Sequence, residues 1–340
     1  MTIKDIARLS GYSLGTVSRV LNHHPDVSEQ ARKKVMAVVE EHGFEPNANA
    51  KHLKMRTRTS IAVLVKGSHN MLFSDILERI QAKFEARGEE VYVAYLDEDA
   101  NEVQYALSLA RQRRPKGFLF LGGDMEFFRK DFKHLTVPCV LLTNFGGDLG
   151  YDNLSSFSTD DMTASEQVMD YLYDCGHRKI GVLGGNLSID QISYRRIKGV
   201  CRFARKKGIL FDTGRQYEPC RYSMADGYQA ARRLLEREPS LTAVFALGDV
   251  IALGAMRAMA DLGLRIPEDI SVVGYDGIPS SEYSIPRLST VRQNPEQLAD
   301  KGVRTLLQAI HYEMPPVHER VPFELVSRES VRRLPADAER

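Results

Sequence analysis

The sequence predicts a small all-α domain at the N-terminus and a larger α/β domain built on parallel, doubly wound sheets. Three short helical patterns fill the first 46 residues, and from residue 60 onward short apolar runs alternate with amphipathic stretches. The 340 residues are too many for one typical hydrophobic core and suit two or three domains. We therefore expect residues 1–46 and 59–334 to form separate domains joined by a linker, 47–58.

Capping and turn residues delimit the three N-terminal helices. Thr2 and Asp5 form a capping pair at the start of the first helix. Gly11 allows a tight turn after it, and Ser13 caps the second helix. Ser28 caps the third helix, which Gly43 ends. The second helix then runs roughly from Leu14 to Leu21. Two helices joined by a glycine-containing turn are typical of a helix-turn-helix unit, whose second helix enters the major groove of DNA.

Side chains on the second helix suit contact with DNA. Short hydrogen-bonding residues that fit phosphate oxygens are Ser13, Thr16, Ser18 and Asn22. Arg19 is the one long side chain there that can make two hydrogen bonds to a guanine. Leu14 and Gly15 allow apolar or close contact, for example with a thymine methyl. The alternative is a purely structural three-helix unit, since such units are common.

The charge distribution singles out the linker. The net charge is only +1, and residues 1–46 carry equal numbers of basic and acidic side chains. The 47–58 segment holds four basic residues and no acid, whereas residues 59–340 carry 36 basic and 39 acidic side chains. The basic segment is therefore either a solvated linker or a contact with nucleic acid.

The larger domain alternates between strand and helix patterns. Apolar runs predict strands at Ile61–Val65, Val91–Leu96, Gly117–Leu121, Cys139–Thr143, Lys179–Leu183, Thr242–Leu247 and Ile270–Tyr275. Amphipathic stretches between them include Asp75–Arg87, Thr163–Cys175, Ala225–Glu236 and Ile251–Leu262. This alternation predicts parallel sheets with helices on both faces. Ligands of such sheets bind at the carboxyl ends of the strands, where several of these runs end in polar or glycine-rich turns.

Several function classes find no support in the sequence. The four cysteines, Cys139, Cys175, Cys201 and Cys220, have neither metal-binding nor redox spacing, and we expect buried, reduced thiols. No apolar run approaches the roughly 18 residues of a membrane helix. The first ten residues mix acidic and basic side chains, unlike a secretory signal, so we expect a cytoplasmic protein. Phosphate-binding and hydrolase motifs are missing, so we expect no enzyme, no cofactor and no metal.

Longer motifs point to one protein family. The head contains TVSRVLN, VSEQARKKV and GFEPN, and the larger domain contains CGHRKIGVLGG, ALGDVIALGAMRAMADLGL and PRLSTVRQN. Together these motifs resemble the LacI/GalR family of bacterial regulators over roughly residues 2–330. The resemblance implies a helix-turn-helix head and a two-lobed α/β domain with the fold of periplasmic sugar-binding proteins. It also implies a sequence-specific transcriptional regulator, expected to repress genes of carbohydrate metabolism.

The resemblance also assigns the DNA contacts. Base recognition is implied for three residues of the second helix, Leu14, Gly15 and Arg19. Asn47 joins the expected phosphate contacts, and 47–58 corresponds to a hinge that becomes helical only on DNA, in a dimer. Such a short segment does not hold a helix by itself, because nucleation is costly. Ala50, Lys51 and Leu53 are then expected at the minor groove, where the leucine would wedge between bases and bend the duplex.

The family's two-lobed architecture implies where the chain divides. The first lobe is expected to take about 59–157 and 289–320, and the second lobe about 158–288 and 321–334. Three crossings between the lobes are expected near Phe157–Asp160, Leu288–Asn294 and Val321–Phe323. Ligand would bind between the lobes.

Matching positions imply five effector-binding residues: Phe73, Arg196, Tyr222, Asp249 and Asp276. An arginine, carboxylates and aromatic faces suit a sugar, whose ring has polar edges and apolar faces. Asp249 is expected to support the site rather than to contact the ligand. This chain departs from the family pattern at Gly248, where a polar residue is common. Lys66 is an unusual charge at the end of a first strand, which leaves a phosphorylated or acidic sugar open.

The expected partners follow from this resemblance. A homodimer would bind pseudo-palindromic, double-stranded operator DNA, and a sugar or sugar-phosphate effector would release it; no membrane partner is expected. Effector and DNA would oppose one another through a coupling energy of about 1–3 kcal/mol, with the sign reversed in a corepressor-type member. The first alternative is a catabolite-control-type regulator that a partner protein switches. A sugar-binding transport protein and a sugar-processing enzyme are further alternatives.

Overall fold

The computed structural model describes residues 3–21, 27–42, 60–67, 70–187, 191–312 and 314–335. By its contacts the chain divides into two compact units, Met1–Thr59 and Ser60–Arg340. Five residues expected to contact DNA lie outside the described residues: Asn22, Asn47, Ala50, Lys51 and Leu53.

The described part of the first unit contains the helices that the sequence predicts. They are α1 (Ile3–Ser10), α2 (Leu14–Leu21) and α3 (Glu29–Glu41). Gly11 takes a φ of 74° in the turn between α1 and α2, and Ser28 caps α3 by accepting a hydrogen bond from the backbone N–H of Ala31. One buried side chain of α1 and two each of α2 and α3 form a small core: Ile6, Val17, Val20, Val35 and Val39.

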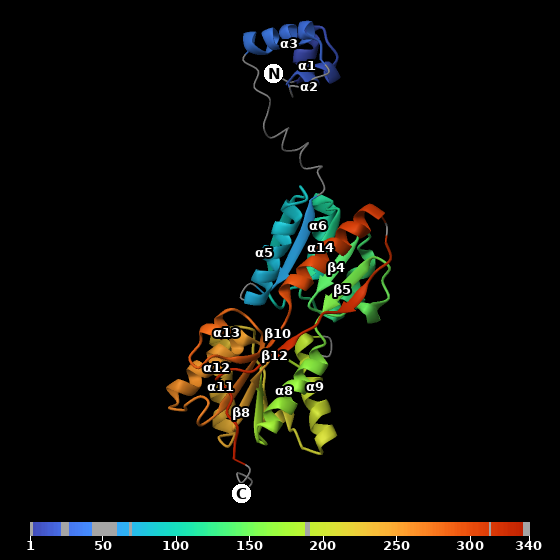
Figure 1. The fold of residues 1–340 in the computed structure, drawn as a ribbon. Coiled ribbons are helices and arrows are strands. Elements are labelled where there is room, and N and C mark those ends of the chain that lie inside the picture. The colour runs from blue at the N-terminus through green and yellow to red at the C-terminus, as the bar shows by residue number, and fades with distance from the viewer. Residues whose placement is uncertain are drawn as a thin grey trace. The chain divides into compact units, whose positions relative to one another are not determined.

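The second unit is built on two six-stranded sheets, one in each lobe (Figure 1). In the first sheet all neighbouring strands are parallel, in the order β11 (His318–Arg320), β5 (Leu154–Ser158), β4 (Cys139–Leu142), β3 (Gly117–Leu121), β1 (Ile61–Lys66) and β2 (Val91–Leu96). The helices of this first lobe are α5 (Met71–Glu85), α6 (Glu102–Arg113), α7 (Met125–Asp131) and α14 (Pro295–Tyr312). Short 3-10 turns come after α7, at Phe132–His134, and after β4, at Gly147–Leu149.

The second lobe repeats this plan. Its sheet has the order β12 (Glu324–Val326), β10 (Ser289–Arg292), β9 (Ser271–Asp276), β8 (Ala243–Ala246), β6 (Ile180–Leu183) and β7 (Tyr217–Glu218), and only β12 is antiparallel to its neighbour. The helices are α8 (Asp161–Asp174), α9 (Ile192–Lys207), α10 (Thr213–Gln216), α11 (Met224–Arg237), α12 (Asp249–Asp261) and α13 (Ser280–Tyr283). The predicted fold class, a helix-turn-helix head with a two-lobed α/β domain, is confirmed.

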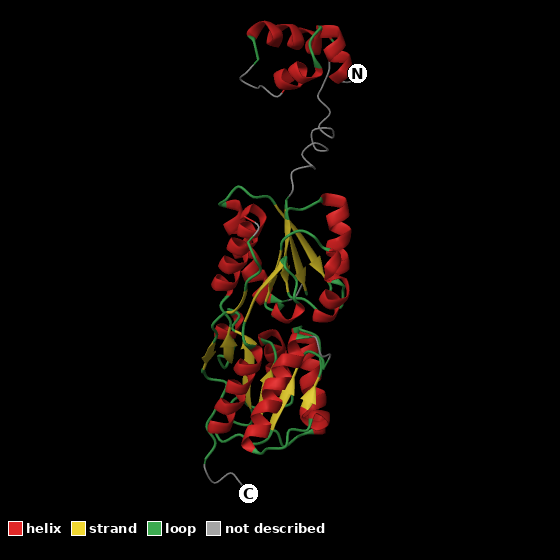
Figure 2. Cartoon of the chain, turned by 90° about the vertical axis from the view of Figure 1, so that its right-hand side faces the viewer, coloured by secondary structure: helices red, strands yellow, loops and turns green. Residues whose placement is uncertain are grey.

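Helices cover both faces of each sheet, as Figure 2 shows. Successive residues of a strand point to opposite faces, so Val63 of β1 packs toward α5 and α14 whereas Leu64 packs toward α6 and α7. In the second lobe, Val244 of β8 packs toward α11 and α12, and Phe245 packs toward α8 and α9. Strands buried on both faces are continuously apolar, which is why the sequence revealed the central ones. None of the helices in the described part of the chain combines the length and apolarity needed to span a bilayer.

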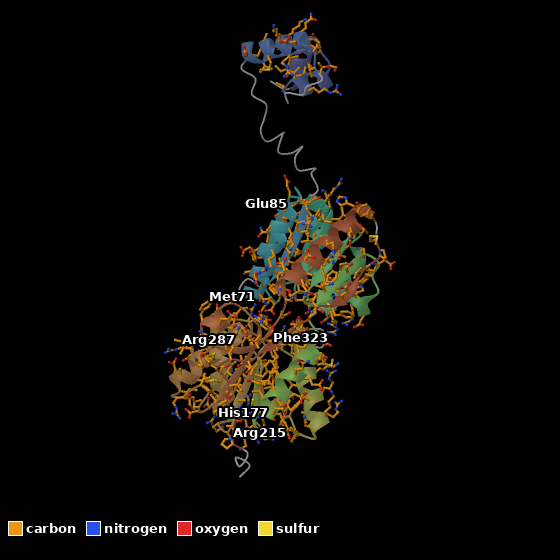
Figure 3. The ribbon with its side chains drawn as sticks, in the orientation of Figure 1. Met71, Glu85, His177, Arg215, Arg287 and Phe323 are labelled. Atoms are coloured by element: carbon orange, nitrogen blue, oxygen red, sulfur yellow. The ribbon has the colours of Figure 1, made fainter. Side chains whose placement is uncertain are left out.

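The chain passes between the lobes three times, after β5, after β10 and between β11 and β12. Phe323, which precedes β12, lies at the level where the lobes meet (Figure 3). The expected assignment of 289–320 to the first lobe needs one correction. Ser289–Arg292 pair with β9 and β12 in the second sheet, so the crossing falls just before α14 begins at Pro295.

The strands that the sequence analysis did not predict are short or polar. β7, β11 and β12 have two or three residues each, and they are recognised as strands only by their hydrogen bonds to a neighbouring strand. β5 reads LSSFS and is nevertheless buried, because its serines find partners. Ser156 Oγ accepts a hydrogen bond from Gly146 N at 2.9 Å and lies 2.8 Å from the ring nitrogen Nδ1 of His318. A periodicity of apolar residues cannot reveal such a strand.

Candidate ligand cleft and nucleic-acid interface

The second helix of the head presents one polar face. Val17 and Val20 are fully buried, whereas Gly15 and Arg19 are exposed. Ser13 Oγ accepts a hydrogen bond from Thr16 N at 3.2 Å and lies 2.9 Å from Thr16 Oγ1, so Ser13 caps the helix. The remaining expected residues of this helix, Leu14 and Ser18, belong to α2. The exposed arginine therefore stands on a capped helix whose opposite face contributes to the core of the head.

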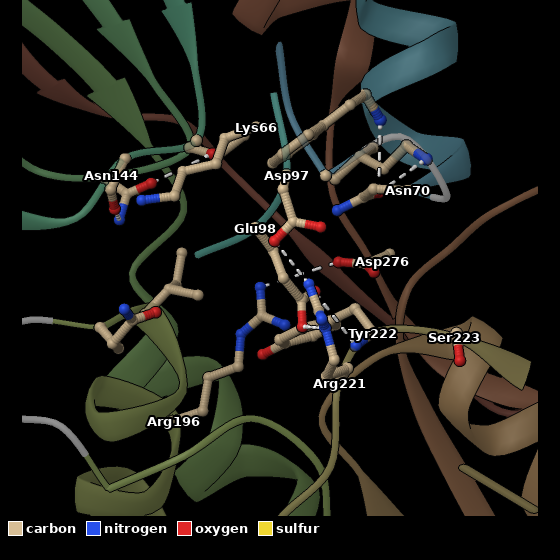
Figure 4. A pocket seen from close by; sticks show the side chains of 18 of the residues that line it. Lys66, Asn70, Asp97, Glu98, Asn144, Arg196, Arg221, Tyr222, Ser223 and Asp276 are labelled. Carbon is tan, nitrogen blue, oxygen red and sulfur yellow. Dashed lines mark hydrogen bonds and ion pairs between the residues drawn. The ribbon is translucent and has the colours of Figure 1, made fainter. Parts of the chain in front are cut away.

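A cleft of about 360 Å³ lies between the two sheets of the second unit, a volume typical of small-molecule sites (Figure 4). Its walls are the turns at the carboxyl ends of the strands, where parallel sheets bind their ligands. Four of the five residues expected to bind an effector line it: Phe73, Arg196, Tyr222 and Asp276. The fifth, Asp249, does not.

Arg196 is the most enclosed cation of the cleft. Its side chain is 4% exposed, and its Nε donates to Asp161 Oδ1 at 2.9 Å. Its Nη2 lies 3.7 Å from Asp276 Oδ1, its Nη1 donates to the backbone oxygen of Leu247, and its guanidinium lies 3.6 Å from the ring centre of Tyr275. The side chain is therefore held from behind in one orientation, with Asp276 beside it at the cleft.

Asp276 is held in an unusual backbone conformation. Its φ is 117°, and Thr143, across the cleft in the first lobe, has a φ of 71°. Residues other than glycine rarely adopt a positive φ, and those that do are concentrated at functional sites. Asp276 Oδ1 also accepts a hydrogen bond from Gln293 Nε2 at 2.9 Å, and Gln293 Oε1 accepts one from Thr159 Oγ1 at 2.8 Å. The cleft carboxylate is thus linked to two of the three crossings.

Asp249 lies behind the cleft wall and supports it. One of its oxygens accepts hydrogen bonds from the backbone N–H groups of Gly277 and Ile278, both at 2.8 Å, and the other accepts from Thr290 Oγ1 at 2.6 Å. These bonds fix the turn that follows Asp276. The structure therefore gives Asp249 the supporting position expected from the sequence, away from the ligand space.

Tyr222 lines the cleft, and its buried hydroxyl has an unmet hydrogen-bonding capacity. Among the described residues, its Oη is a buried polar atom with no hydrogen-bond partner. The ring occupies the space in front of Gly248, where an added Cβ would lie 3.0 Å from Tyr222 Cδ1. The departure noted at Gly248 therefore has a structural reason, since a larger residue there would displace the tyrosine ring.

Contacts across the mouth of the cleft join the two lobes. Arg221 of the second lobe pairs with all three acids of the turn after β2. Its Nη2 atom lies 2.7 Å from Asp97 Oδ1 and 3.4 Å from Asp99 Oδ2, and its Nε atom lies 2.5 Å from Glu98 Oε1. Deeper in, Gln191 Nε2 donates to Asp124 Oδ2 at 2.6 Å. The sequence analysis missed this ion-pair cluster, although an acidic triplet directly after a predicted strand is a signal that the strand-end rule could have used.

The fold and these two sites together define a regulatory protein with a DNA-binding head and a ligand-sensing body. Residues 2–47 match the family described as bacterial regulatory proteins, lacI family, and residues 169–331 match the periplasmic binding protein-like domain. The HTH-type transcriptional regulator MalR of Clostridium butyricum is 33% identical over 339 residues, which cover 97% of this chain and 99% of the relative. The chain belongs to the LacI family of bacterial transcriptional regulators.

Solved structures agree with this assignment. The lac repressor dimer bound to operator and the anti-inducer ONPF has a TM-score of 0.73 and 27% identity, covering 98% of this chain and 99% of the other. The complex of the transcriptional regulator CelR with cellobiose has a TM-score of 0.70 and 26% identity, covering 97% and 99% of the two chains. The relatives are regulators rather than enzymes.

The two buried carboxylates make a contribution to the free energy of unfolding that decreases as pH rises. Burial raises the pKa of Asp276 to about 6, against the attraction of Arg196, and burial together with the charge of Asp276 raises the pKa of Asp249 to about 8. The folded protein thus retains protons that the unfolded chain, with aspartate pKa values near 3.8, has already released. Stability contributed by the protonated groups is therefore lost between about pH 4 and about pH 8.

Asp276→Asn removes one titrating group and its charge beside Asp249. We expect the melting temperature of the variant, relative to wild type, to increase as pH rises through that window, because the variant does not have to release the proton of Asp276. Thermal denaturation of both proteins across the window measures this difference. A difference that is independent of pH would contradict the prediction.

Proposed function

We propose that this regulator binds a pseudo-palindromic operator as a homodimer, represses genes of carbohydrate metabolism, and is released from DNA by a sugar or sugar-phosphate effector held in the cleft. The observation that carries the proposal is the cleft itself, where Arg196, Asp276 and the unpartnered Tyr222 hydroxyl converge. We further propose that it acts in the cytoplasm and works by binding rather than by catalysis.

The chemistry of the cleft favours a carbohydrate. Arg196 supplies N–H donors, Asp276 supplies a strong acceptor, and the Tyr222 hydroxyl can both donate and accept. The ring of Phe73 adds an apolar surface on the opposite lobe. Polar groups that converge around an aromatic surface suit a ring with hydroxyl edges and apolar faces. The solved complex of a structural relative with cellobiose supports the same ligand class.

The exposed face of α2 is proposed as the operator-reading surface. Arg19 would contact a guanine, and Leu14 with Gly15 would lie against neighbouring bases. Phosphate contacts are proposed for Ser13, Thr16, Ser18, Asn22 and Asn47. In the 47–58 hinge, Ala50, Lys51 and Leu53 would enter the minor groove. Support comes from the match of residues 2–47 to the lacI family.

Exposed apolar side chains near α13 support the proposed dimer. Tyr283 and Ile285 are 83% and 97% exposed, and Met71, at the start of α5, is 37% exposed. Ser280 Oγ lies 3.7 Å from Met71 Sδ, so these residues belong to one region shared by both lobes. Neighbouring apolar side chains on a surface mark interaction sites, and a two-fold axis would pair the region with itself.

Arg19→Ala tests the operator-reading surface. Operators are first selected from random inverted repeats with the wild-type protein, and binding is then measured by fluorescence anisotropy. We expect the variant to lose about 1–3 kcal/mol of operator binding and to relax base preference at one position in each half-site. Lys34→Ala, which removes an exposed charge of α3, should weaken binding without changing base preference. Unchanged base preference in Arg19→Ala would refute its role.

Tyr222→Phe tests the sugar site, because it removes only the hydroxyl and leaves the ring on Gly248. One lost hydrogen bond to an effector corresponds to about 0.5–1.5 kcal/mol, so the effector should bind roughly two- to tenfold more weakly. Titration calorimetry with a panel of sugars measures this loss, and Tyr228→Phe, whose hydroxyl donates to Asp261 at 3.1 Å, is the matched control. If no sugar binds the wild-type protein, the alternative of a partner-protein switch gains support.

Ile285→Asp tests the dimer. A charge placed in an apolar interface is costly, so the dissociation constant of the homodimer should rise by at least about tenfold. Analytical ultracentrifugation measures it. Leu210→Asp is the matched control, since Leu210 is 86% exposed and lies beyond the end of α9, away from α13. The proposed interface is contradicted if both substitutions raise the dissociation constant equally, or if neither substitution raises it.

A further inference from the structure

Each cationic side chain among the described residues that line the cleft is bound to a carboxylate of the protein itself. The three are Lys66, Arg196 and Arg221. Arg196 is held by Asp161, and Arg221 is held by the acidic triplet after β2. An anionic group on a ligand would therefore find these cations already neutralised.

Lys66 is the cation that a phosphate group on a ligand would need, and it already forms an ion pair with Glu102. The Nζ atom of Lys66 lies 2.7 Å from Glu102 Oε2, and the two side chains are 8% and 1% exposed. The same Nζ lies 5.0 Å from the ring centre of Phe127. Glu102 Oε1 also accepts a hydrogen bond from Asp124 N at 2.5 Å, which anchors the carboxylate to the turn after β3. Lys66 is thus directed into the first lobe.

Carboxylates outnumber cations among the described residues that line the cleft. Four line it, Asp97, Glu98, Asp226 and Asp276, against three cations, and Asp97 and Glu98 are the partners of Arg221. Asp226 Oδ2 accepts one hydrogen bond from Ser223 Oγ at 2.5 Å, and the backbone N–H of Asp226 donates to Ser223 Oγ at 3.0 Å. A ligand phosphate would lose its water, face these carboxylates and find its potential partners already bound. Charges interact strongly in such an enclosed, weakly screened space.

We propose that the cleft selects an uncharged, hydroxyl-bearing ligand over its phosphorylated form, and that Glu102 sets this selectivity by holding Lys66. The inference rests on the sugar-effector function proposed above and narrows it to one charge class. Glu102 lies behind the cleft wall and acts through Lys66, so it is a positioning residue. Specificity of this kind comes from an unfavourable interaction with the wrong ligand as much as from contacts with the right one.

Paired probes on the full-length wild-type protein give the first test. Ribose, glucose and cellobiose are each compared with their monophosphate esters by titration calorimetry. For any pair that binds, the uncharged sugar should bind at least about tenfold more tightly. Tighter binding of the esters would overturn the selectivity and leave the proposed sugar-effector function standing. If neither member of any pair binds, the sugar-effector function fails as well.

Glu102→Gln gives the second test, because glutamine keeps an acceptor for Asp124 N–H and removes the negative charge that neutralises Lys66. The variant should recover at least about tenfold in affinity for the ester relative to the sugar. Inorganic phosphate should also raise its melting temperature, against chloride at equal ionic strength, while leaving that of the wild type unchanged. This second readout does not require the natural ligand.

Two controls separate selectivity from general effects on folding. Glu89→Gln breaks a similar pair, Lys116 Nζ to Glu89 Oε2 at 2.8 Å, away from the cleft residues of the same lobe. It should lose stability without gaining any response to phosphate. The double variant Lys66→Met with Glu102→Gln should gain none either, because the freed cation is absent. A gain in either control, or no gain in Glu102→Gln, would refute the role of Glu102.

Discussion

The buried contact of Arg196 with Asp161 and Asp276 is the interaction on which the ligand-facing wall of the second lobe depends. A charge enclosed to this degree is tolerated only when it is paired and its hydrogen-bonding groups are satisfied. Asp161 stands at the start of α8, Arg196 in the first turns of α9, and Asp276 at the end of β9. The cluster therefore joins three elements that are distant in sequence. Removing Arg196 would leave the two carboxylates without a buried cation, whereas removing either carboxylate would leave Arg196 paired with the other.

The same cluster is connected to the joints between the lobes. Asp276 is bound to Gln293, Gln293 to Thr159, and Arg320 donates to the backbone oxygen of Thr159 at 3.0 Å. Thr159 and Gln293 lie in the first two crossings of the chain, and Arg320, the last residue of β11, directly precedes the third. A ligand that competes for Asp276 would therefore perturb hydrogen bonds that reach the segments joining the lobes. Coupling between sites requires such a structural element with two arrangements, and the crossings are the natural place for it.

The cleft combines strong polarity with compensated charge. Arg221 and the acidic turn after β2 close its mouth with partly exposed ion pairs, which salt screens and which contribute modestly. Lys66 and Glu102 form a far more enclosed pair within the first lobe. The first arrangement adds little net stability to the contact between the lobes. The second suits a fixed wall that determines which ligands are accepted.

The sequence alone determined the fold class, the three helices of the head with their caps, and the central strands of both sheets. Those features are local: apolar periodicity, a serine before a helix and a glycine in a turn act over a few residues. Family-like motifs also placed Phe73, Arg196, Tyr222 and Asp276 together before any geometry was known. Only the tertiary structure decided that Ser289–Arg292 join the second sheet, that Tyr222 fills the space left by Gly248, and that Glu102 occupies Lys66. These are contacts between residues far apart in the chain, and the identity of a side chain's neighbour across a fold is not written in the residues beside it.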